Sequence, residues 1–208
     1  MPLKHACFIS YRHHQQSEIM TRFVEEFSDV LASELAMLVE LEVYRDVLRI
    51  QGGDFYNEAL ARSLCESVCM VMIFTPTYFS EAHPYCTREY AAMKEIEARR
   101  LEPGAEHRLI IPVVLRNFDQ LPDEIRSTRQ VYKFEQYFTC DPRLSKNKSF
   151  AKEIAGLAQY VAARCRELRE LQVDCSGYSM PDEEAARTLA ARLTSPPPGF
   201  PGREVPRG

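Results

Sequence analysis

Short runs dominated by apolar residues alternate along the chain with longer stretches of mixed polarity. Runs at 5–10, 41–44, 68–74 and 109–115 predict four strands, and a weaker run at 130–134 predicts a fifth. The run from Val68 to Phe74 has no polar member, which indicates a strand covered on both faces. Because Pro112 has no backbone N–H, we expect the strand at 109–115 to lie at an edge or to contain a bulge.

The stretches between these runs have the spacing of amphipathic helices. From Ile19 to Leu35 the apolar residues recur every three or four positions, so they share one side of a helix. Similar spacing predicts helices at 55–64, 85–100 and 150–171. A shorter helix is expected at 182–193, where acidic residues of a first turn follow Pro181.

Five strands alternating with helices predict an α/β fold with a flavodoxin-like, doubly wound sheet. It should contain about five mostly parallel strands with helices on both faces. In such sheets the ligand lies beyond the carboxyl ends of the strands, where the strand order reverses. The loops after Ser10, Tyr44 and Phe74 should therefore share one rim around a single crevice.

The length of 208 residues fits one domain with appendages. We expect the domain at 1–172 and a C-terminal extension at 173–208, which holds the short helix and a Pro/Gly-rich tail. From Ser195 onward the chain is too rich in proline and glycine for regular structure. The tail is interpreted either as a flexible end or as a linker to a further module.

Charge and hydropathy argue against nucleic acids and membranes as partners. The formal net charge is −4, and the basic clusters at 99–100 and 164–169 are interleaved with acids, which is typical of solvated helix faces. The longest apolar run falls far short of the roughly 20 residues of a membrane span. The polar stretch at 11–18 is unlike a signal peptide, so a cytoplasmic protein is expected.

The cysteines predict neither disulfides nor a metal site. There are seven, an odd number, with no Cys-x-x-Cys pair. Without a secretory leader they indicate reduced thiols in a reducing cell interior. Cys65 and Cys69 straddle a helix-to-strand junction, and the five histidines have no metal-like spacing.

Three motifs, each on its expected element, together resemble the TIR domain family over about residues 4–170. Phe8-Ile-Ser-Tyr-Arg12 is similar to the first-strand motif of that family. Tyr44-Arg-Asp46, followed by Gly52-Gly53 and then Ala59-Leu60, resembles its second strand and BB loop. Tyr78-Phe-Ser-Glu-Ala-His-Pro-Tyr-Cys-Thr-Arg-Glu-Tyr90 is similar to its Ser-x-x-Tyr and Trp-Cys-x-x-Glu-Leu signature.

The third motif departs from the family pattern in several places. Thr75 stands where the family often has serine, Tyr85 where it often has tryptophan, and Tyr90 where it often has leucine. The stretch between Tyr78 and Cys86 is also a residue or two longer than usual. An aromatic residue still precedes the cysteine, so a stacking surface is retained.

Resemblance to enzymatic TIR domains implies that Glu89 is catalytic and that NAD is the substrate, with no separate cofactor. Nicotinamide in NAD is already a cationic leaving group, and the transition state is oxocarbenium-like, as in glycoside hydrolysis. A carboxylate beside the ribose can stabilise the developing charge. The alternative is a helix acid favoured by the macrodipole and paired with Arg88 or Lys94.

The first-strand motif supplies further candidates for substrate binding, namely Phe8, Ser10, Tyr11 and Arg12. The last three leave the strand at the rim, where a hydroxyl and a guanidinium could bind ribose or diphosphate. Capping of the loop is an equally good interpretation of these three residues.

The remaining candidates belong to the other two motifs. Family resemblance places Arg45 and Asp46 near the nucleotide, although they could form a simple ion pair. Tyr85 could stack on a base or ring, or could belong to the core. Cys86 is interpreted as a packing residue, and the adjacent His13 and His14 as loop residues facing water.

The resemblance implies an NAD glycohydrolase or ADP-ribosyl cyclase in immune or anti-phage signalling. Family behaviour implies activation by self-association, with the BB loop region at 45–54 contacting another TIR protomer, and a sensor or effector protein as a further partner. One alternative is a TIR interaction scaffold without turnover. A weaker one is an enzyme resembling nucleoside deoxyribosyltransferases, which share the sheet and a glutamate.

Overall fold

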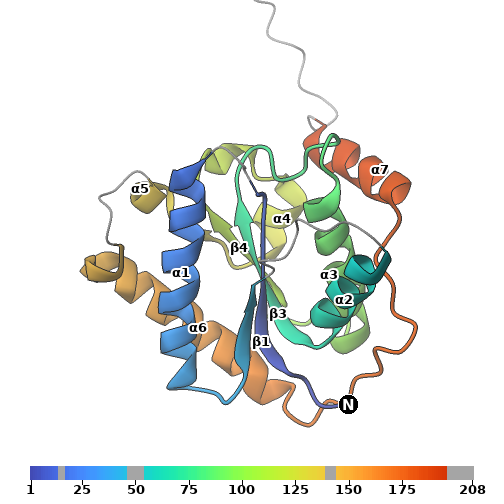
Figure 1. Ribbon diagram of the computed structural model, residues 1–208, viewed down its shortest axis with the longest axis horizontal. Coiled ribbons are helices and arrows are strands. Elements are labelled where there is room, and N and C mark those ends of the chain that lie inside the picture. The colour runs from blue at the N-terminus through green and yellow to red at the C-terminus, as the bar shows by residue number, and fades with distance from the viewer. Residues whose placement is uncertain (14–16, 46–53, 139–143, 196–208) are drawn as a thin grey trace, which may run out of the picture.

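The computed structural model describes residues 1–13, 17–45, 54–138 and 144–195 of the chain, folded around one parallel sheet (Figure 1). The strand order is β2-β1-β3-β4-β5, and every neighbouring pair is parallel. The expected doubly wound α/β fold is thereby confirmed. The strands are β1 (His5–Tyr11), β2 (Glu42–Arg45), β3 (Ser67–Phe74), β4 (Ile110–Val114) and β5 (Tyr132–Lys133).

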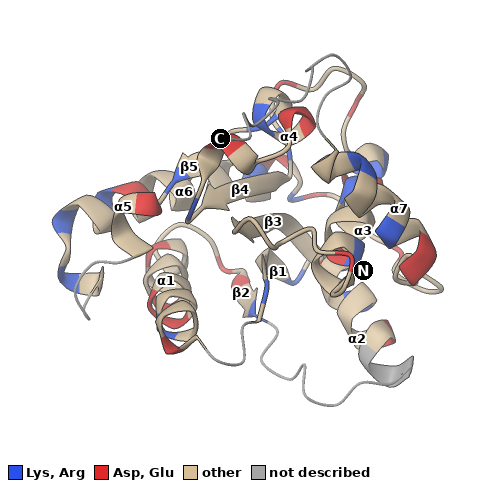
Figure 2. Cartoon of the chain, turned by 90° about the horizontal axis from the view of Figure 1, so that it is seen from above, with Lys and Arg blue, Asp and Glu red and all other residues tan. Residues whose placement is uncertain are grey.

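Helices cover both faces of this sheet, as the view from above shows (Figure 2). Helices α1 and α6 pack together on one face, while α2 and α3 pack on the other and α7 lies against α3. Two four-to-six-residue helices, α4 and α5, were not predicted. The helices are α1 (Glu18–Ala36), α2 (Asp54–Cys65), α3 (Tyr85–Arg100), α4 (Asp123–Thr128), α5 (Glu135–Phe138), α6 (Lys148–Glu167) and α7 (Glu183–Thr194), with 3₁₀ turns η1 (Phe118–Gln120) and η2 (Leu144–Lys146).

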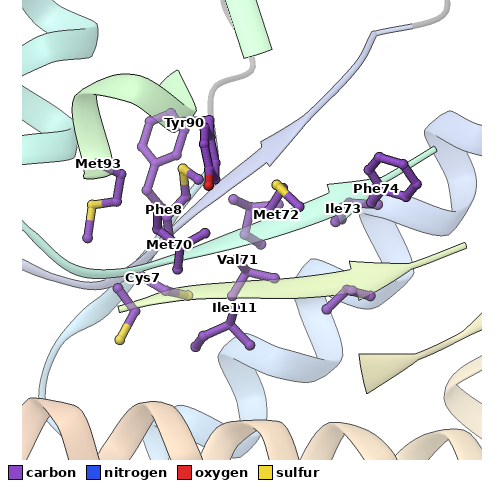
Figure 3. Packing of buried hydrophobic residues seen from close by; sticks show 14 of the residues in the cluster. Cys7, Phe8, Met70, Val71, Met72, Ile73, Phe74, Tyr90, Met93 and Ile111 are labelled. Carbon is purple, nitrogen blue, oxygen red and sulfur yellow. The ribbon is translucent and has the colours of Figure 1, made fainter. Parts of the chain in front are cut away.

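The centre of the core is β3, whose eight residues are all buried, as its unbroken apolar run predicts. Successive side chains point to opposite faces, so Met70 packs beside Phe8 and beneath Tyr90 and Met93 of α3 (Figure 3). This packing holds α3 against the sheet, and its last residue, Arg100, donates to the Ser67 carbonyl at the start of β3.

Helix α1 begins at an N-cap, where the Ser17 side chain accepts a hydrogen bond from the Met20 N–H at 3.3 Å. Its apolar stripe of Phe23, Phe27 and Leu31 is fully buried. The predicted stripe also included Ile19, but this residue is 52% exposed. Ile19 lies in the first turn of the helix.

Strand β4 is internal, so the expected edge position or bulge at Pro112 is wrong. Pro112 pairs in register with Met72 of β3. On the other side β5 pairs only with Val113 and Val114. Backbone groups alternate in direction along a strand. Leu115 N bonds to the Phe74 carbonyl, so Leu115 faces β3. Phe134 N bonds to the Val114 carbonyl, so Val114 faces β5, and Pro112, two residues earlier, faces the same way. The missing N–H of Pro112 therefore points to a position that β5 is too short to reach.

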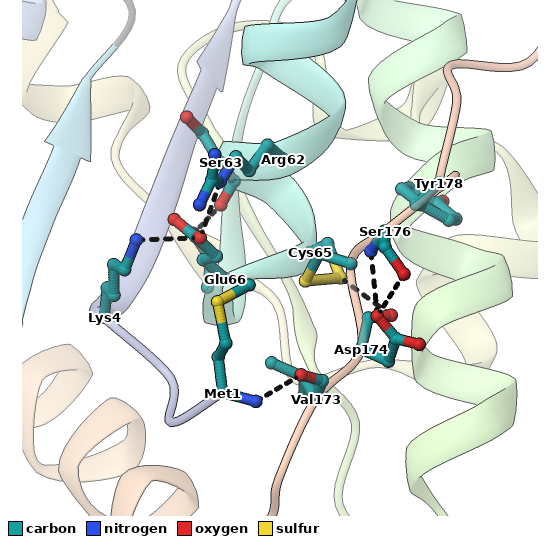
Figure 4. The surroundings of a disulfide bond; sticks show 12 residues. Met1, Lys4, Arg62, Ser63, Cys65, Glu66, Val173, Asp174, Ser176 and Tyr178 are labelled. Atoms are coloured by element: carbon teal, nitrogen blue, oxygen red, sulfur yellow. Dashed lines mark hydrogen bonds and ion pairs between the residues drawn. A yellow bond between two sulfur atoms is a disulfide. The ribbon is translucent and has the colours of Figure 1, made fainter.

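After α6 the chain crosses the α2–α3 face as a segment that we call the C-terminal strap, residues 173–195. Val173 exchanges two backbone hydrogen bonds with Met1, at 2.7 and 2.8 Å (Figure 4). The Tyr178 hydroxyl donates to the Ala92 carbonyl of α3 at 2.8 Å. The strap ends in α7, whose Asp182 N-cap confirms the expected helix. The domain boundary at 172 and 173 stays a prediction, and the tail from 196 lies outside the described residues.

A disulfide joins Cys65, the last residue of α2, to Cys175 in the strap (Figure 4). The expectation that the cysteines are all reduced is therefore wrong for this pair. The two residues are 110 positions apart, and such a pairing leaves no local signal in the sequence. The free cysteines of the described residues, Cys7, Cys69, Cys86 and Cys165, are all buried.

The described residues contain neither a candidate membrane span nor a candidate metal cluster. None of their helices combines the length and apolar character needed to cross a bilayer. Within the same ranges, histidine, cysteine, aspartate and glutamate side chains form no group of three or more that could hold a metal ion.

Candidate functional site

The loops that follow β1 and β3 meet at the carboxyl-terminal edge of the sheet. These strands are neighbours at the point where the strand order reverses, which is where open α/β sheets bind ligands. The guanidinium of Arg12 donates to the Thr77 carbonyl at 2.7 Å and joins the two loops. The third predicted loop, after Tyr44, lies mostly outside the described residues.

Glu89 lies directly beneath this junction, in the second turn of α3. It shares the helix face of Cys86 and Met93, at spacings of three and four, and this face packs on the sheet. Its exposed fraction is 0%. A buried carboxylate requires hydrogen-bond donors, and the Ser10 hydroxyl of β1 donates to Glu89 Oε2 at 2.5 Å.

The Ser10 oxygen also bonds to the hydroxyl of Tyr78, which follows β3. Both residues are fully buried. Three separate elements thus bring two hydroxyl groups and one carboxylate into contact. Tyr78 belongs to the third sequence motif, but the motif does not reveal its role, because its contact with Ser10 spans 68 residues.

The predicted alternative was a helix acid favoured by the macrodipole and paired with Arg88 or Lys94, and its pairing is wrong. Arg88 donates through Nε to the Pro181 carbonyl at 2.6 Å, and its Nη1 lies 3.4 Å from Asn57 Oδ1. Lys94 pairs instead with Glu124 of α4. Both cations therefore fasten α3 to neighbouring elements.

The first-strand candidates lie in two environments. Phe8 is fully buried and stacks on Tyr44 with ring centroids 5.3 Å apart, which gives it a packing position. Ser10 is turned inward to Glu89. Tyr11 and Arg12 are half-buried at the rim, where the Tyr11 ring contacts the ring of the exposed His13.

The other candidates lie around the same edge. Arg45 is half-buried at the end of β2, in register with Ile9 of β1. Tyr85 begins α3 and is 38% exposed, so its ring is open to solvent and not part of the core. Cys86 is buried, as its packing interpretation requires. Asp46 and His14 lie outside the described residues.

A second buried carboxylate, Glu97, anchors the far half of α3. Its Oε2 accepts hydrogen bonds from the backbone N–H groups of Leu109 at 2.6 Å and Ile110 at 3.2 Å. Arg129 donates to both Glu97 oxygens, at 2.9 and 3.0 Å. Burial works against the Arg129 charge, but the hydrogen bonds and charge of Glu97 outweigh it and raise the pKa of Arg129.

Three buried thiols of the described core, Cys7, Cys69 and Cys165, are not competing nucleophiles. Burial raises the pKa of Cys7 and Cys69, and that of Cys165 to about 12. A thiol is a nucleophile only as the thiolate. These side chains therefore remain protonated and unreactive near neutral pH.

A hollow of about 430 Å³ lies at the opposite edge of the sheet, near the amino-terminal ends of β1 and β2. Its wall includes Leu3, Leu38, Leu41 and Leu168. Glu40 also lines it, but the hollow lies at the amino-terminal ends of the strands and away from the reversal point, so the carboxyl-terminal rim remains the candidate site.

The chain is similar to a known protein family and to solved structures. A family model described as "TIR domain" matches residues 7–146, which include all the residues of the rim. No curated protein matches the chain in sequence. Among solved structures, it is similar to the TIR domains of "the activated Roq1 resistosome directly recognizing the pathogen effector XopQ". The identity is 16% and the TM-score 0.40, over 89% of this chain and 96% of that one.

Proposed function

Because the chain belongs to the TIR domain family, we propose that it is an enzyme that cleaves the nicotinamide–ribose bond of NAD, with Glu89 as its catalytic residue. The observation that carries this proposal is the position of the Glu89 carboxylate. The carboxylate lies at the reversal point of the sheet and accepts a hydrogen bond from Ser10, and Glu89 belongs to the third of the three sequence motifs.

The reaction needs no strong general acid, but it needs a negative charge beside the ribose. As the bond between the ribose carbon and the pyridinium nitrogen breaks, its electron pair neutralises the nitrogen, and positive charge develops on the sugar. The Glu89 carboxylate stabilises that charge. Water then adds to the sugar carbon and releases a proton, giving ADP-ribose, or a hydroxyl or ring nitrogen of the substrate closes a cyclic product.

Residues at the rim supply binding groups for the rest of the substrate. The guanidinium groups of Arg12 and Arg45 match the diphosphate in charge and geometry. The exposed ring of Tyr85 offers a stacking surface at the start of α3. Phe8 is left out of this binding set because it is buried in the core.

The same proposal includes control by self-association. Glu89 has no exposed surface, so ribose reaches its carboxylate only after neighbouring groups rearrange. Contact with another TIR protomer through region 45–54 would supply that rearrangement and couple NAD consumption to assembly. In this proposal a sensor or effector protein triggers the assembly, and NAD loss or its product is the immune signal.

The decisive experiment follows nicotinamide release and product identity by mass spectrometry after the full chain is incubated with NAD. We expect Glu89→Gln and Glu89→Ala to lower turnover by about 100-fold or more, as loss of a transition-state charge contact does. Glu95→Gln is the matched control, since Glu95 is exposed on the same helix and pairs with Arg99 at 3.7 Å. Equal turnover by Glu89→Gln and the wild type would remove Glu89 from the mechanism.

A scaffold without turnover is the second candidate, and one observation favours it. Glu89 is fully buried and hydrogen-bonded, as a purely structural carboxylate would be. In that case the chain would form assemblies while NAD remained intact under every condition that promotes assembly. Detection of nicotinamide from the assembled protein would exclude the scaffold.

A further inference from the structure

The directions of the O–H bonds of Ser10 and Tyr78 follow from the single proton that each hydroxyl carries. An ionised carboxylate only accepts hydrogen bonds, so the single proton of the Ser10 hydroxyl points at Glu89 Oε2. The Ser10 oxygen must then accept in its contact with Tyr78. The Tyr78 proton therefore points to Ser10, and both O–H dipoles are directed toward the carboxylate.

This alignment addresses the main physical difficulty of the site. Burial favours the neutral form of a carboxyl group, whereas stabilising an oxocarbenium ion requires the anion. Donors that point at a carboxylate favour its charged form, and hydroxyl groups in a chain polarise one another. They also restrict a glutamate side chain that otherwise turns about three bonds.

We propose that Tyr78, acting through Ser10, is a positioning residue that keeps Glu89 ionised and directed at the ribose. This inference rests on the proposed function and adds a residue with no role in it so far. The relay runs from Tyr78 through Ser10 to Glu89 and joins the loop after β3, strand β1 and helix α3.

The hydroxyl of Tyr78 can be tested apart from its ring. The ring packs at the edge of the core, 4.9 Å from Phe79 and 6.3 Å from Phe74 between centroids. Tyr78→Phe keeps these contacts and removes only the oxygen. Tyr160→Phe is the matched control, because the Tyr160 hydroxyl bonds to the backbone of Arg108, away from the rim.

The first measurement is the pH profile of nicotinamide release by the full chain. In Tyr78→Phe we expect kcat to fall about tenfold, as for loss of a hydrogen bond that supports a charge, while KM stays within about twofold. The acidic limb should move to higher pH, because the anion has lost a supporting donor. Tyr160→Phe should retain the wild-type profile.

The second measurement is an infrared pH titration, which needs no turnover. The protonated carboxyl band of Glu89 is identified by its loss in Glu89→Gln. In Tyr78→Phe this band should rise at a higher pH than in the wild type. Ser10→Ala should give a similar shift, and adding Tyr78→Phe to it should change little more, since the relay is already cut.

The outcomes separate the two proposals. If the wild type releases no nicotinamide, or Glu89→Gln is as active as the wild type, the proposed function fails and the infrared titration still decides the relay. If the Glu89 band titrates at the same pH in Tyr78→Phe and the wild type, the relay is overturned, whatever happens to kcat. An unchanged acidic limb in an active Tyr78→Phe enzyme overturns it as well.

Discussion

Helix α3 carries two fully or nearly buried carboxylates that are held in different ways. Glu97 accepts two backbone N–H groups and a bidentate guanidinium, so its charge is saturated by groups that cannot leave. Glu89 Oε2 accepts a hydrogen bond from the Ser10 hydroxyl, which is a weaker donor than a guanidinium. The arrangement around Glu97 is typical of a structural carboxylate.

Glu97→Gln should destabilise the fold more than any exposed substitution on the same helix. It leaves the Arg129 guanidinium, which is 5% exposed, without its counter-charge, and such a loss costs about 3 kcal/mol. Urea unfolding would measure the loss as a lower free energy of unfolding. Glu95→Gln, which removes an exposed ion pair, should change that energy by less than about 1 kcal/mol. Equal effects of the two substitutions would show that the buried pair is energetically minor.

At the scale of elements, the spacing of apolar residues predicts where helices and strands begin and end, because local sequence controls these bounds. Helix α3 begins and ends at the predicted residues, and the β3 run differs from the prediction by one residue. The bond between Ser10 and Glu89 spans 79 residues and the disulfide spans 110. No local pattern encodes such contacts, so the sequence could place Glu89 on its helix but could not predict its partners. Pro112 was misjudged for the same reason, since the length of β5 decides whether its missing N–H matters.

The C-terminal strap should depend on the disulfide for its attachment. Replacing both Cys65 and Cys175 with serine should lower the free energy of unfolding by about 2–4 kcal/mol, because the cross-link restricts the unfolded chain. Hydrogen exchange should accelerate in the strap and α7 more than in β3. Reductant should weaken the wild type to the level of the double variant and leave the variant unchanged. A wild type insensitive to reductant would mean that the disulfide adds nothing to stability.

At the scale of the whole molecule, the burial of Glu89 makes a single protomer a poor catalyst in the proposed function. The rim is formed within one chain, yet its carboxylate has no exposed surface. We call the conformation in which Glu89 is covered the closed state. A neighbouring protomer lowers the population of the closed state only if it binds more tightly to an open state in which the carboxylate is accessible.

The rate of nicotinamide release per protomer should therefore rise with protein concentration. A sharper test keeps the wild-type concentration fixed and adds Glu89→Gln protein, which retains the outer surface but lacks the carboxylate. We expect the wild-type rate to rise severalfold, because inactive protomers still contribute to assembly. A rate per wild-type protomer that is constant in both series would mean that each chain acts alone.

The bond between α2 and the strap also divides the molecule topologically. It closes a covalent ring from Cys65 to Cys175 that contains β3, α3, β4, β5 and α6. Ser10 approaches from the open amino-terminal arm, while Tyr78 and Glu89 belong to the ring. A protease that cuts one peptide bond inside the ring thus frees no fragment, and the nicked halves separate only after the sulfur bridge is reduced.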